Sequence, residues 1–318
     1  MIKFGAVNID ISHPMNFAWA LEQPELNGRA KYVAVYNDGF RGEEEVKAFA
    51  SKNNLVICKT LEELADMVDV AFIHTCNWDK HVDYIKPFTS RGVKVFVDKP
   101  IAGNMKDLRT LEEMVENGAE ILGHSALRYT FEIDNFKAKC KEFETRPINA
   151  LCTVGGDGFT YQVHAVEHLL GIFDANPVSC RLVSSVKTAD SICENYLIKF
   201  DDGAVGQYTA LDNKGIPFNT VIITETMKGG SDFIYTVDNW KIYIALLSRV
   251  CDYVEGKKDR MAKVSDLTKS VKIMLAGKVS KENGGIEVSL DSPLLDTVSF
   301  DGYAYEKDYA SRAKVLYK

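Results

Sequence analysis

The chain has 318 residues, of which 46% are hydrophobic and 26% are charged, and its formal net charge is −7. This ordinary globular composition excludes disordered, collagen-like and coiled-coil chains, and an acidic chain without a Lys/Arg block is not expected to bind nucleic acid. No apolar run approaches the roughly 18 residues that a membrane span needs, and the seven scattered cysteines contain no CxxC pair. We therefore expect a cytoplasmic protein with free thiols and, at about 150 residues per domain, two domains.

Residues 1–123 alternate between strand-like and helix-like patterns. The expected strands are 3–9, 31–36, 55–57, 70–74, 93–97 and 120–122, and the expected helices are 15–21, 43–52, 61–68, 80–90 and 105–117. Strands that alternate with helices of about ten residues form right-handed βαβ units, and apolar strands are buried where helices cover both faces of a parallel sheet. The pattern predicts an α/β domain with a Rossmann-type, doubly wound parallel sheet.

Residues 124–318 show a different pattern, in which strand follows strand. Helices are expected at 131–143, 163–173, 239–255 and 265–279, and strands at 149–154 and through 178–236. Asp202-Gly203 and Lys228-Gly229-Gly230 are hairpin-turn signals. This pattern predicts a second, α+β domain with a mainly antiparallel sheet, beginning at residue 124. The polar, tyrosine-rich stretch from Asp291 onward either wraps the protein or frays.

Several chemically active side chains fall at the carboxyl ends of predicted strands, where open parallel sheets bind their ligands. They are His13, His74, His124 and, directly after the fifth strand, Asp98-Lys99-Pro100. A lysine that is desolvated at this edge has a lowered pKa and can act as an acid or a base near neutral pH. The alternative is an ordinary exposed lysine.

The first strand-to-helix turn lacks the G-x-G-x-x-G pattern of dinucleotide-binding proteins and runs instead from Asn8 to His13. Asparagine tolerates the left-handed conformation, so Asn8 is able to replace the first glycine. Asp10 would repel a pyrophosphate that it faced. Pro14 suits the first position of a helix, so the anion-binding helix N-terminus is kept.

Two further loops are candidates for cofactor contacts. Asp38, after the second strand, could accept a hydrogen bond from an adenine ribose, which favours NAD, whereas Arg41 leaves NADP open. Thr75-Cys76-Asn77, followed by His81, suits contacts to a ribose or to nicotinamide. The alternative is a helix-entry loop in which Asn77 is the N-cap.

The pentad from His164 to His168 has the HxxEH pattern. On a helix, positions i and i+4 share one face, so the two histidines could hold a zinc ion with Glu167 as the base of a hydrolase. A third ligand would be needed, and the sequence does not identify one.

Taken in order, these segments resemble the Gfo/Idh/MocA family of oxidoreductases. Asp98-Lys99-Pro100 resembles the family's E-K-P motif, the segment from Thr75 to His81 resembles T-P-x-x-x-H, and Ser125-Ala126-Leu127-Arg128-Tyr129 resembles its R-Y stretch. The run from Gly155 to Glu167 resembles G-G-G followed by D-x-x-x-H-x-x-D, with Thr160 in the place of the aspartate. Asp10-Ile11-Ser12-His13 resembles an Asp-Thr-Ser-His form of the first turn.

The resemblance implies a Rossmann domain, a second domain with an open-faced sheet, and a homodimer or homotetramer. It implies NAD(P)-dependent oxidation or reduction of a sugar, cyclitol or similar hydroxy compound, with NAD favoured and NADP possible. Lys99 is then the central catalytic residue, His164 its acid/base partner, and Thr160 stands in place of a third catalytic group. Substrate contacts are expected from Lys99, Ser125, Arg128, Tyr161 and His164. Cofactor contacts are expected from Asn8, Asp10, Ile11, Ser12, His13, Asn37, Asp38, Thr75, Cys76, Asn77, His81, Asp98 and Lys99.

Two alternatives to the dehydrogenase remain. The missing glycines and Thr160 favour a family member that has lost catalysis and serves as a ligand-binding or regulatory protein. The HxxEH pentad favours, more weakly, a zinc hydrolase.

Overall fold

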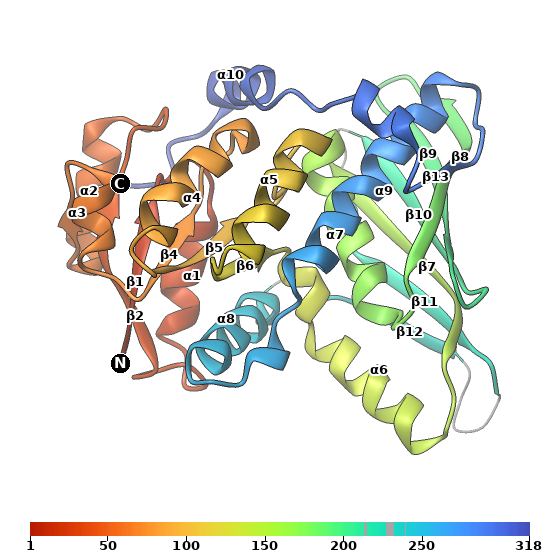
Figure 1. Ribbon diagram of the computed structural model, residues 1–318, viewed down its shortest axis with the longest axis horizontal. Coiled ribbons are helices and arrows are strands. Elements are labelled where there is room, and N and C mark those ends of the chain that lie inside the picture. Colours follow the sequence, from red (N-terminus) through yellow and green to blue (C-terminus); the bar gives the residue numbers. More distant parts are fainter. Residues whose placement is uncertain (213–214, 227–231, 239) are drawn as a thin grey trace. The chain divides into compact units, whose positions relative to one another are not determined.

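The computed structural model describes residues 1–212, 215–226, 232–238 and 240–318, and its contacts divide the chain into two units (Figure 1). Unit 1 comprises Met1–His124, Leu246–Asp266 and Asp301–Lys318, and unit 2 comprises Ser125–Ala245 and Leu267–Phe300. The first break falls within one residue of the boundary expected from the sequence. Two later segments, expected in the second domain, pack with the first instead, because their contacts are with residues more than 200 positions earlier.

Unit 1 contains a six-stranded parallel sheet, as the sequence predicts. Its order is β3-β2-β1-β4-β5-β6, so the direction of winding reverses between β1 and β4. That reversal is the point at which doubly wound sheets bind ligands. The strands are β1 (Ile2–Val7), β2 (Ala30–Tyr36), β3 (Val56–Ile57), β4 (Val70–Ile73), β5 (Lys94–Asp98) and β6 (Ile121–His124).

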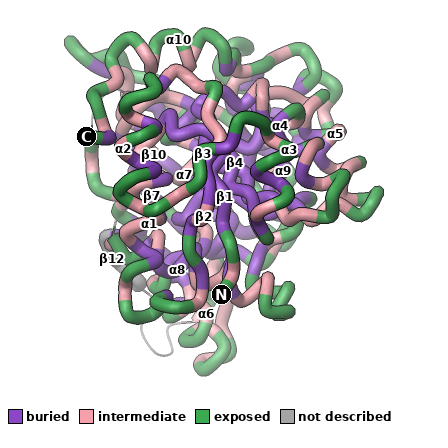
Figure 2. The backbone as a smooth tube through the Cα atoms, turned by 90° about the vertical axis from the view of Figure 1, so that its left-hand side faces the viewer, coloured by how far each residue is buried: buried purple, intermediate pink, exposed green. Residues whose placement is uncertain are grey.

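The helices of unit 1 cover this sheet and bury its centre. All four residues of β4 are buried, and β4 lies within the buried middle of Figure 2. The Phe72 ring lies 4.7 Å from Phe4 and 4.9 Å from Phe96, so side chains of three adjacent strands form one aromatic core. The helices are α1 (His13–Leu21), α2 (Glu43–Asn53), α3 (Leu61–Ala65), α4 (His81–Thr89), α5 (Met105–Glu116) and α10 (Gly302–Arg312).

The described part of unit 2 contains a seven-stranded sheet of order β12-β11-β7-β10-β9-β8-β13, in which only β7 and β10 pair in parallel. Gly203, with φ 86°, turns the chain between β9 and β10, which confirms the predicted hairpin. The predicted turn at 228–230 lies outside the described residues. The strands are β7 (Pro147–Gly156), β8 (Pro177–Lys187), β9 (Ile192–Phe200), β10 (Val205–Asp212), β11 (Asn219–Thr224), β12 (Asp232–Thr236) and β13 (Val288–Ser289).

Helices line one face of the second sheet. Cys152 of β7 lies against the carbonyl of Ala165 on α7, and the Tyr208 hydroxyl of β10 lies 3.7 Å from the Met274 sulfur of α9. Of the remaining helices, α6 (Phe131–Glu142), α7 (Gly158–Ile172) and most of α9 (Val264–Glu282) belong to unit 2, whereas most of α8 (Lys241–Val254) belongs to unit 1. Within the described part of the chain, none of the helices has the length and apolar character needed to cross a lipid bilayer.

Candidate active site

Asp98, the last residue of β5, is the centre of a buried hydrogen-bond network in unit 1. Its Oδ2 accepts from His13 Nδ1 at 2.7 Å and from His74 Nδ1 at 3.0 Å, and its Oδ1 accepts from the backbone N–H of Lys99 at 2.8 Å. Burial raises the pKa of this carboxyl, but the charge and hydrogen bond of His13 and the hydrogen bond of His74 outweigh it and hold the pKa well below its usual range. Asp98 is therefore a buried carboxylate.

His74 extends this network toward the interior. Burial lowers the pKa of His74, so its imidazole is neutral at pH 7. Because Nδ1 donates to Asp98, Nε2 accepts from the Tyr32 hydroxyl at 3.0 Å. The result is a continuous line of hydrogen bonds from Tyr32 through His74 and Asp98 to His13 at the start of α1. The sequence predicts the histidines at this edge but not Tyr32, which is indistinguishable from a core residue of β2.

Lys99 follows directly and is half-buried. The backbone N–H of Lys99 donates to the Asp98 carboxylate, and the next residue is Pro100. The backbone from which the lysine side chain projects is therefore anchored on both sides.

Asn8 shapes the first turn (residues 8–12), as the sequence predicts. Its φ of 64° places it in the left-handed region that a glycine usually occupies. Its Oδ1 accepts from the backbone N–H groups of Asp38 and Gly39 at 2.9 and 3.1 Å, and its Nδ2 donates to Tyr84 Oη at 3.2 Å. The side chain therefore ties the first turn to the loop after β2 (residues 37–42, the β2 loop).

Asp10 is fully buried and faces the loop after β4 (residues 74–80, the β4 loop). Its Oδ2 accepts from Thr75 Oγ1 at 3.0 Å and from the Cys76 N–H at 3.1 Å, whereas its Oδ1 has no hydrogen-bond partner among the described residues. Burial raises the pKa of this carboxyl, against the effect of those two bonds. A Cβ atom on Gly39 would lie 2.1 Å from Oδ1, so only glycine fits there. Asp10 thus links the first turn to the β4 loop.

The β2 loop carries one exposed acidic side chain and one buried basic side chain. Asp38 is exposed and accepts from the hydroxyls of Tyr36 and Tyr84. Arg41 is buried, and its guanidinium donates to the Asp10 carbonyl twice, at 3.0 and 3.1 Å. Asn37 accepts from the backbone N–H of Ile9 at 3.2 Å, which holds the β2 loop on the first turn. The guanidinium of Arg41 is therefore committed to protein atoms.

The β4 loop is held by its own side chains. Asn77 Oδ1 accepts from the Asp79 N–H at 3.1 Å and caps a short 3-10 helix, Trp78–Lys80, which confirms the helix-entry alternative for this residue. His81 is buried, with Nδ1 3.1 Å from the Ile101 carbonyl and Nε2 3.3 Å from the Thr75 carbonyl. These contacts hold His81 in place within the fold, and Thr75 and Cys76 are buried as well. Their cofactor contacts stay predictions.

In unit 2, His164 projects from α7 and contacts Ser125. Ser125 Oγ lies 2.7 Å from His164 Nδ1, and the rings of Tyr161 and Phe218 each meet the imidazole edge-on at 5.9 Å. Of the five residues expected to contact substrate, Ser125, Tyr161 and His164 lie together here, whereas Lys99 belongs to unit 1. Phe218 gives no signal in the sequence, because it follows a run without clear periodicity.

Thr160 lies one helical turn before His164 on α7. It is buried, and its hydroxyl donates to the Asp157 carbonyl at 2.8 Å in the first turn of α7. A hydroxyl used in this way bonds back onto the backbone of its own helix. The catalytic place of Thr160 expected from the resemblance stays a prediction.

The remainder of the HxxEH pentad is structural. Glu167 is fully buried and receives two bonds from the Arg128 guanidinium, at 2.5 and 3.1 Å. His168 lies 2.9 Å from the Leu127 carbonyl and 3.0 Å from the Thr220 hydroxyl. Among the described residues, no three His, Cys, Asp or Glu side chains are grouped to hold a metal ion. The base of the zinc hypothesis, Glu167, is thus held in an ion pair with Arg128, whose expected contact with substrate stays a prediction.

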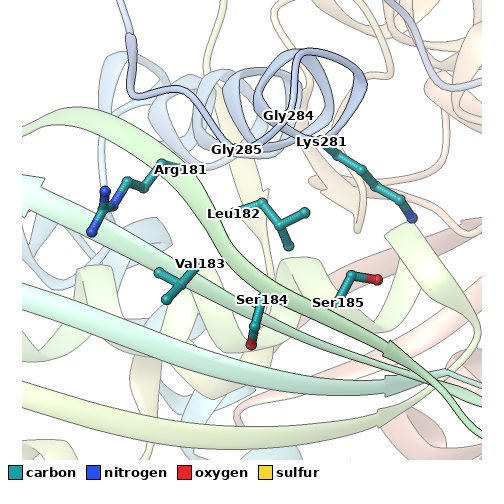
Figure 3. A pocket seen from close by; sticks show the side chains of 8 residues that line it. All are labelled: Arg181, Leu182, Val183, Ser184, Ser185, Lys281, Gly284 and Gly285. Carbon is teal, nitrogen blue, oxygen red and sulfur yellow. The ribbon is translucent and has the colours of Figure 1, made fainter.

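A cavity of about 290 Å³ lies elsewhere in unit 2, along β8 and the turn after α9 (Figure 3). Its two cations, Arg181 and Lys281, point in opposite directions in Figure 3. Lys281 Nζ lies 2.6 Å from a Glu194 oxygen, which neutralises its charge. The cavity therefore offers no convergent set of polar groups.

The comparison with protein families agrees with the geometry of unit 1. Residues 15–124 match the model of the Gfo/Idh/MocA oxidoreductase family, NAD-binding Rossmann fold. Over these residues, which are less than half of the chain, unit 1 is similar to the NAD-binding domain of that family. No curated protein matches the chain.

Solved structures show that the fold extends over nearly the whole chain. A scyllo-inositol dehydrogenase from Lactobacillus casei with bound NAD(H) and scyllo-inositol is 13% identical, with a TM-score of 0.73 over 92% of this chain and 100% of that one. A myo-inositol dehydrogenase from the same organism, in complex with NAD(H) and myo-inositol, is 13% identical, with a TM-score of 0.72 over 93% and 99%. A UDP-N-acetylglucosamine 3-dehydrogenase from Acidithiobacillus ferrooxidans is 12% identical, with a TM-score of 0.69 over 88% and 97%.

Proposed function

We propose that the protein is an NAD-dependent oxidoreductase that transfers a hydride between nicotinamide and a carbinol carbon of a cyclitol, sugar or similar hydroxy compound. One observation carries the proposal. In a Rossmann domain of an oxidoreductase family, the carboxyl end of β5 holds a buried Asp98 carboxylate that orients His13 and anchors Lys99. A fold kept only for binding would not need a buried charge with two imidazole partners at this position.

The residues of the first turn and the β2 loop fit NAD. Ser12, the N-cap of α1, makes no side-chain capping bond, so its hydroxyl does not compete for the N–H groups that would face a pyrophosphate. Asp10 is buried and turned toward the β4 loop, so it sets no exposed charge against that group. Asp38 is exposed where an acid accepts from the adenine ribose, and the committed guanidinium of Arg41 disfavours the extra phosphate of NADP.

When bound, nicotinamide supplies the hydride acceptor or donor. The chain must then move the proton of the substrate hydroxyl, a task that the family resemblance assigns to Lys99 and His164. Ser125 Oγ accepts from the Leu127 N–H and lies on Nδ1 of His164, and its hydroxyl can either donate to Nδ1 or accept from it. Nε2 of His164 can therefore act as acid or as base without losing its orienting partner.

The test is turnover of a panel of cyclitols and sugars with NAD, followed as absorbance of the reduced nicotinamide. We expect at least one compound to be oxidised, and about 10²-fold or greater loss in Lys99→Ala and His164→Ala, the usual scale for a proton-transfer group. Lys106→Ala removes an exposed lysine of the same unit and should leave the rate unchanged. If the folded protein neither binds NADH nor turns over any compound, the non-catalytic alternative replaces this proposal.

A further inference from the structure

One stretch of chain, Asp301–Lys318 (the C-terminal segment), lies across the loops that follow β1, β2 and β4. Figure 1 shows α10 beyond the ends of these strands and the chain terminus beside α2. The sequence left open whether the stretch from Asp291 onward wraps or frays, and its part from Asp301 to Lys318 packs within unit 1.

The first part of the segment binds the β4 loop. Glu306 Oε2 accepts from Asn77 Nδ2, and its Oε1 accepts from Lys80 Nζ, both at 2.9 Å. The backbone N–H of Gly302 donates to Asp79 at 2.8 Å, and a Cβ atom on Gly302 would lie 2.4 Å from Asn77 Oδ1. The C-terminal segment therefore approaches the β4 loop closely, and its contacts are with groups at both ends of the 3-10 helix.

Aromatic side chains continue these contacts toward the β2 loop. The Tyr305 ring lies 5.2 Å from that of Trp78, and Tyr309 meets Phe40 edge-on at 6.0 Å. Trp78 is buried. One face of α10 thus joins the β4 loop to the β2 loop.

The end of the segment reaches the first turn itself. The Lys314 carbonyl accepts from Arg41 Nη1 at 2.7 Å, and the Leu316 N–H donates to Glu45 at 3.2 Å. Tyr317 is buried, and its hydroxyl donates to the Ile11 carbonyl at 2.8 Å. Its ring lies 5.2 Å from Phe49 of α2. A buried phenol with a hydrogen-bond partner is an anchor, which a frayed terminus would not have.

These three loops are the ones that a dinucleotide needs. In a doubly wound sheet the pyrophosphate approaches the first turn, and the adenosine ribose meets the acid after the second strand. The C-terminal segment contacts the first turn at Ile11, the β2 loop at Arg41 and the β4 loop at Asn77. Asp38 is only three residues before Arg41. The segment therefore borders the space that the adenosine half of a dinucleotide would take, although Asp38 itself is exposed.

We propose that the C-terminal segment is an intramolecular gate that borders the adenosine half of the cofactor site and is displaced when a dinucleotide binds. This inference rests on the proposed function. The gate can open because most of its contacts are weak individually: the Lys80–Glu306 ion pair is partly exposed, and pairs of that kind contribute little. Tyr317 is the firmest anchor. A closed gate lowers the apparent affinity by the fraction of molecules that are open.

The test compares three ligands on the full-length chain. NADH and ADP-ribose both need the adenosine half, whereas nicotinamide mononucleotide does not. In Tyr317→Ala we expect NADH and ADP-ribose to bind about tenfold more tightly, because the open fraction rises, with nicotinamide mononucleotide unchanged. Glu306→Gln, which keeps the size of the side chain and weakens the bond to Lys80, should act in the same direction and less strongly. Val315→Ala and Lys307→Ala are matched controls at exposed positions of the segment.

Hydrogen exchange of the wild-type chain gives a second readout that needs no variant to fold. Saturating NADH should speed exchange of the Gly302 and Leu316 amides, and nicotinamide mononucleotide should not. Two outcomes would overturn the gate: NADH binding in Tyr317→Ala that is equal to or weaker than in the wild type, or slower exchange of the Gly302 and Leu316 amides with NADH. Either would show that the segment is a fixed wall of the site. The proposed function would still stand. Absence of NADH and ADP-ribose binding in every variant would overturn both.

Discussion

The Arg128 guanidinium and the Glu167 carboxylate form a two-bond ion pair inside unit 2, with side-chain exposures of 9% and 0%. Removing one partner leaves the other charge buried and unpaired. We expect Arg128→Ala to lower the free energy of unfolding by about 3–5 kcal/mol, and the double variant Arg128→Met with Glu167→Leu to recover most of that loss. Urea unfolding followed by circular dichroism measures both.

Lys137 and Asp174 provide the matched comparison, because this pair is also in unit 2 but has exposures of 39% and 85%. Lys137→Ala should cost less than about 1 kcal/mol. If Arg128→Ala costs no more than this control and instead weakens substrate binding, the substrate role expected from the sequence would be restored and the structural role abandoned.

At the scale of elements, α7 is held against the stretch before α6 by a close approach at Gly171. Replacing a helical glycine by alanine ordinarily stabilises a helix by about 1 kcal/mol. Here a Cβ atom would lie 2.7 Å from the Arg128 carbonyl oxygen and 2.8 Å from Ile133 Cδ1. We therefore expect Gly171→Ala to destabilise unit 2 by about 1–3 kcal/mol, as overpacking does.

Gly277 of α9 gives a graded comparison, since its Cβ atom would meet the Tyr196 ring at 3.2 Å rather than a backbone atom. A side chain can shift by a few tenths of an ångström, so Gly277→Ala should cost less. Thermal unfolding of the two variants gives the order. A Gly171→Ala protein that melts above the wild type would show that α7 is free to move away from Arg128.

Hydrophobic periodicity predicts the elements of unit 1 closely, because each strand or helix is coded locally. It misses where α7 begins, since the glycines from 155 to 158 indicate a turn, and the helix starts at Gly158 itself. It also misses α10, a polar helix whose face is defined by Trp78 and Asn77 far away in the chain. Elements that depend on partners hundreds of residues distant carry no local signal.

The same limit applies to the candidate site when the whole molecule is considered. Residue type and position at a strand end identify Asp98 and Lys99 as candidates, and the family resemblance adds His164. They do not show which polar residues already have their hydrogen-bond partners within the protein, as Arg41 and His81 do. Whether a polar side chain has hydrogen-bond partners depends on residues far away in the chain. Only the structure shows which residues these are.

Histidines buried in both units make the stability of the whole chain depend on pH. Burial lowers the pKa of His74 and His81 in unit 1 and the pKa of His168 in unit 2, the last to about 4. The folded chain keeps them neutral while the unfolded chain takes up protons below its own pKa of about 6.5. The stability they contribute is therefore complete above that pH and is lost as the pH falls toward the folded pKa.

For His168 the loss between pH 7 and pH 4.5 should reach about 2–3 kcal/mol, at about 1.4 kcal/mol for each pKa unit. Asp10, whose pKa is raised by burial, acts in the opposite direction in the same interval, so the total alone does not isolate the histidine. The measurement is thus the difference between the wild type and His168→Gln in urea unfolding at pH 7.5, 6.5, 5.5 and 4.5. The variant costs stability at pH 7.5, because bonds to Leu127 and Thr220 are lost, but that deficit should shrink as the pH falls. If the stability difference between His168→Gln and the wild type is the same at every pH, then His168 has the same pKa in the folded and unfolded chains. Solvent would then reach it in the folded chain.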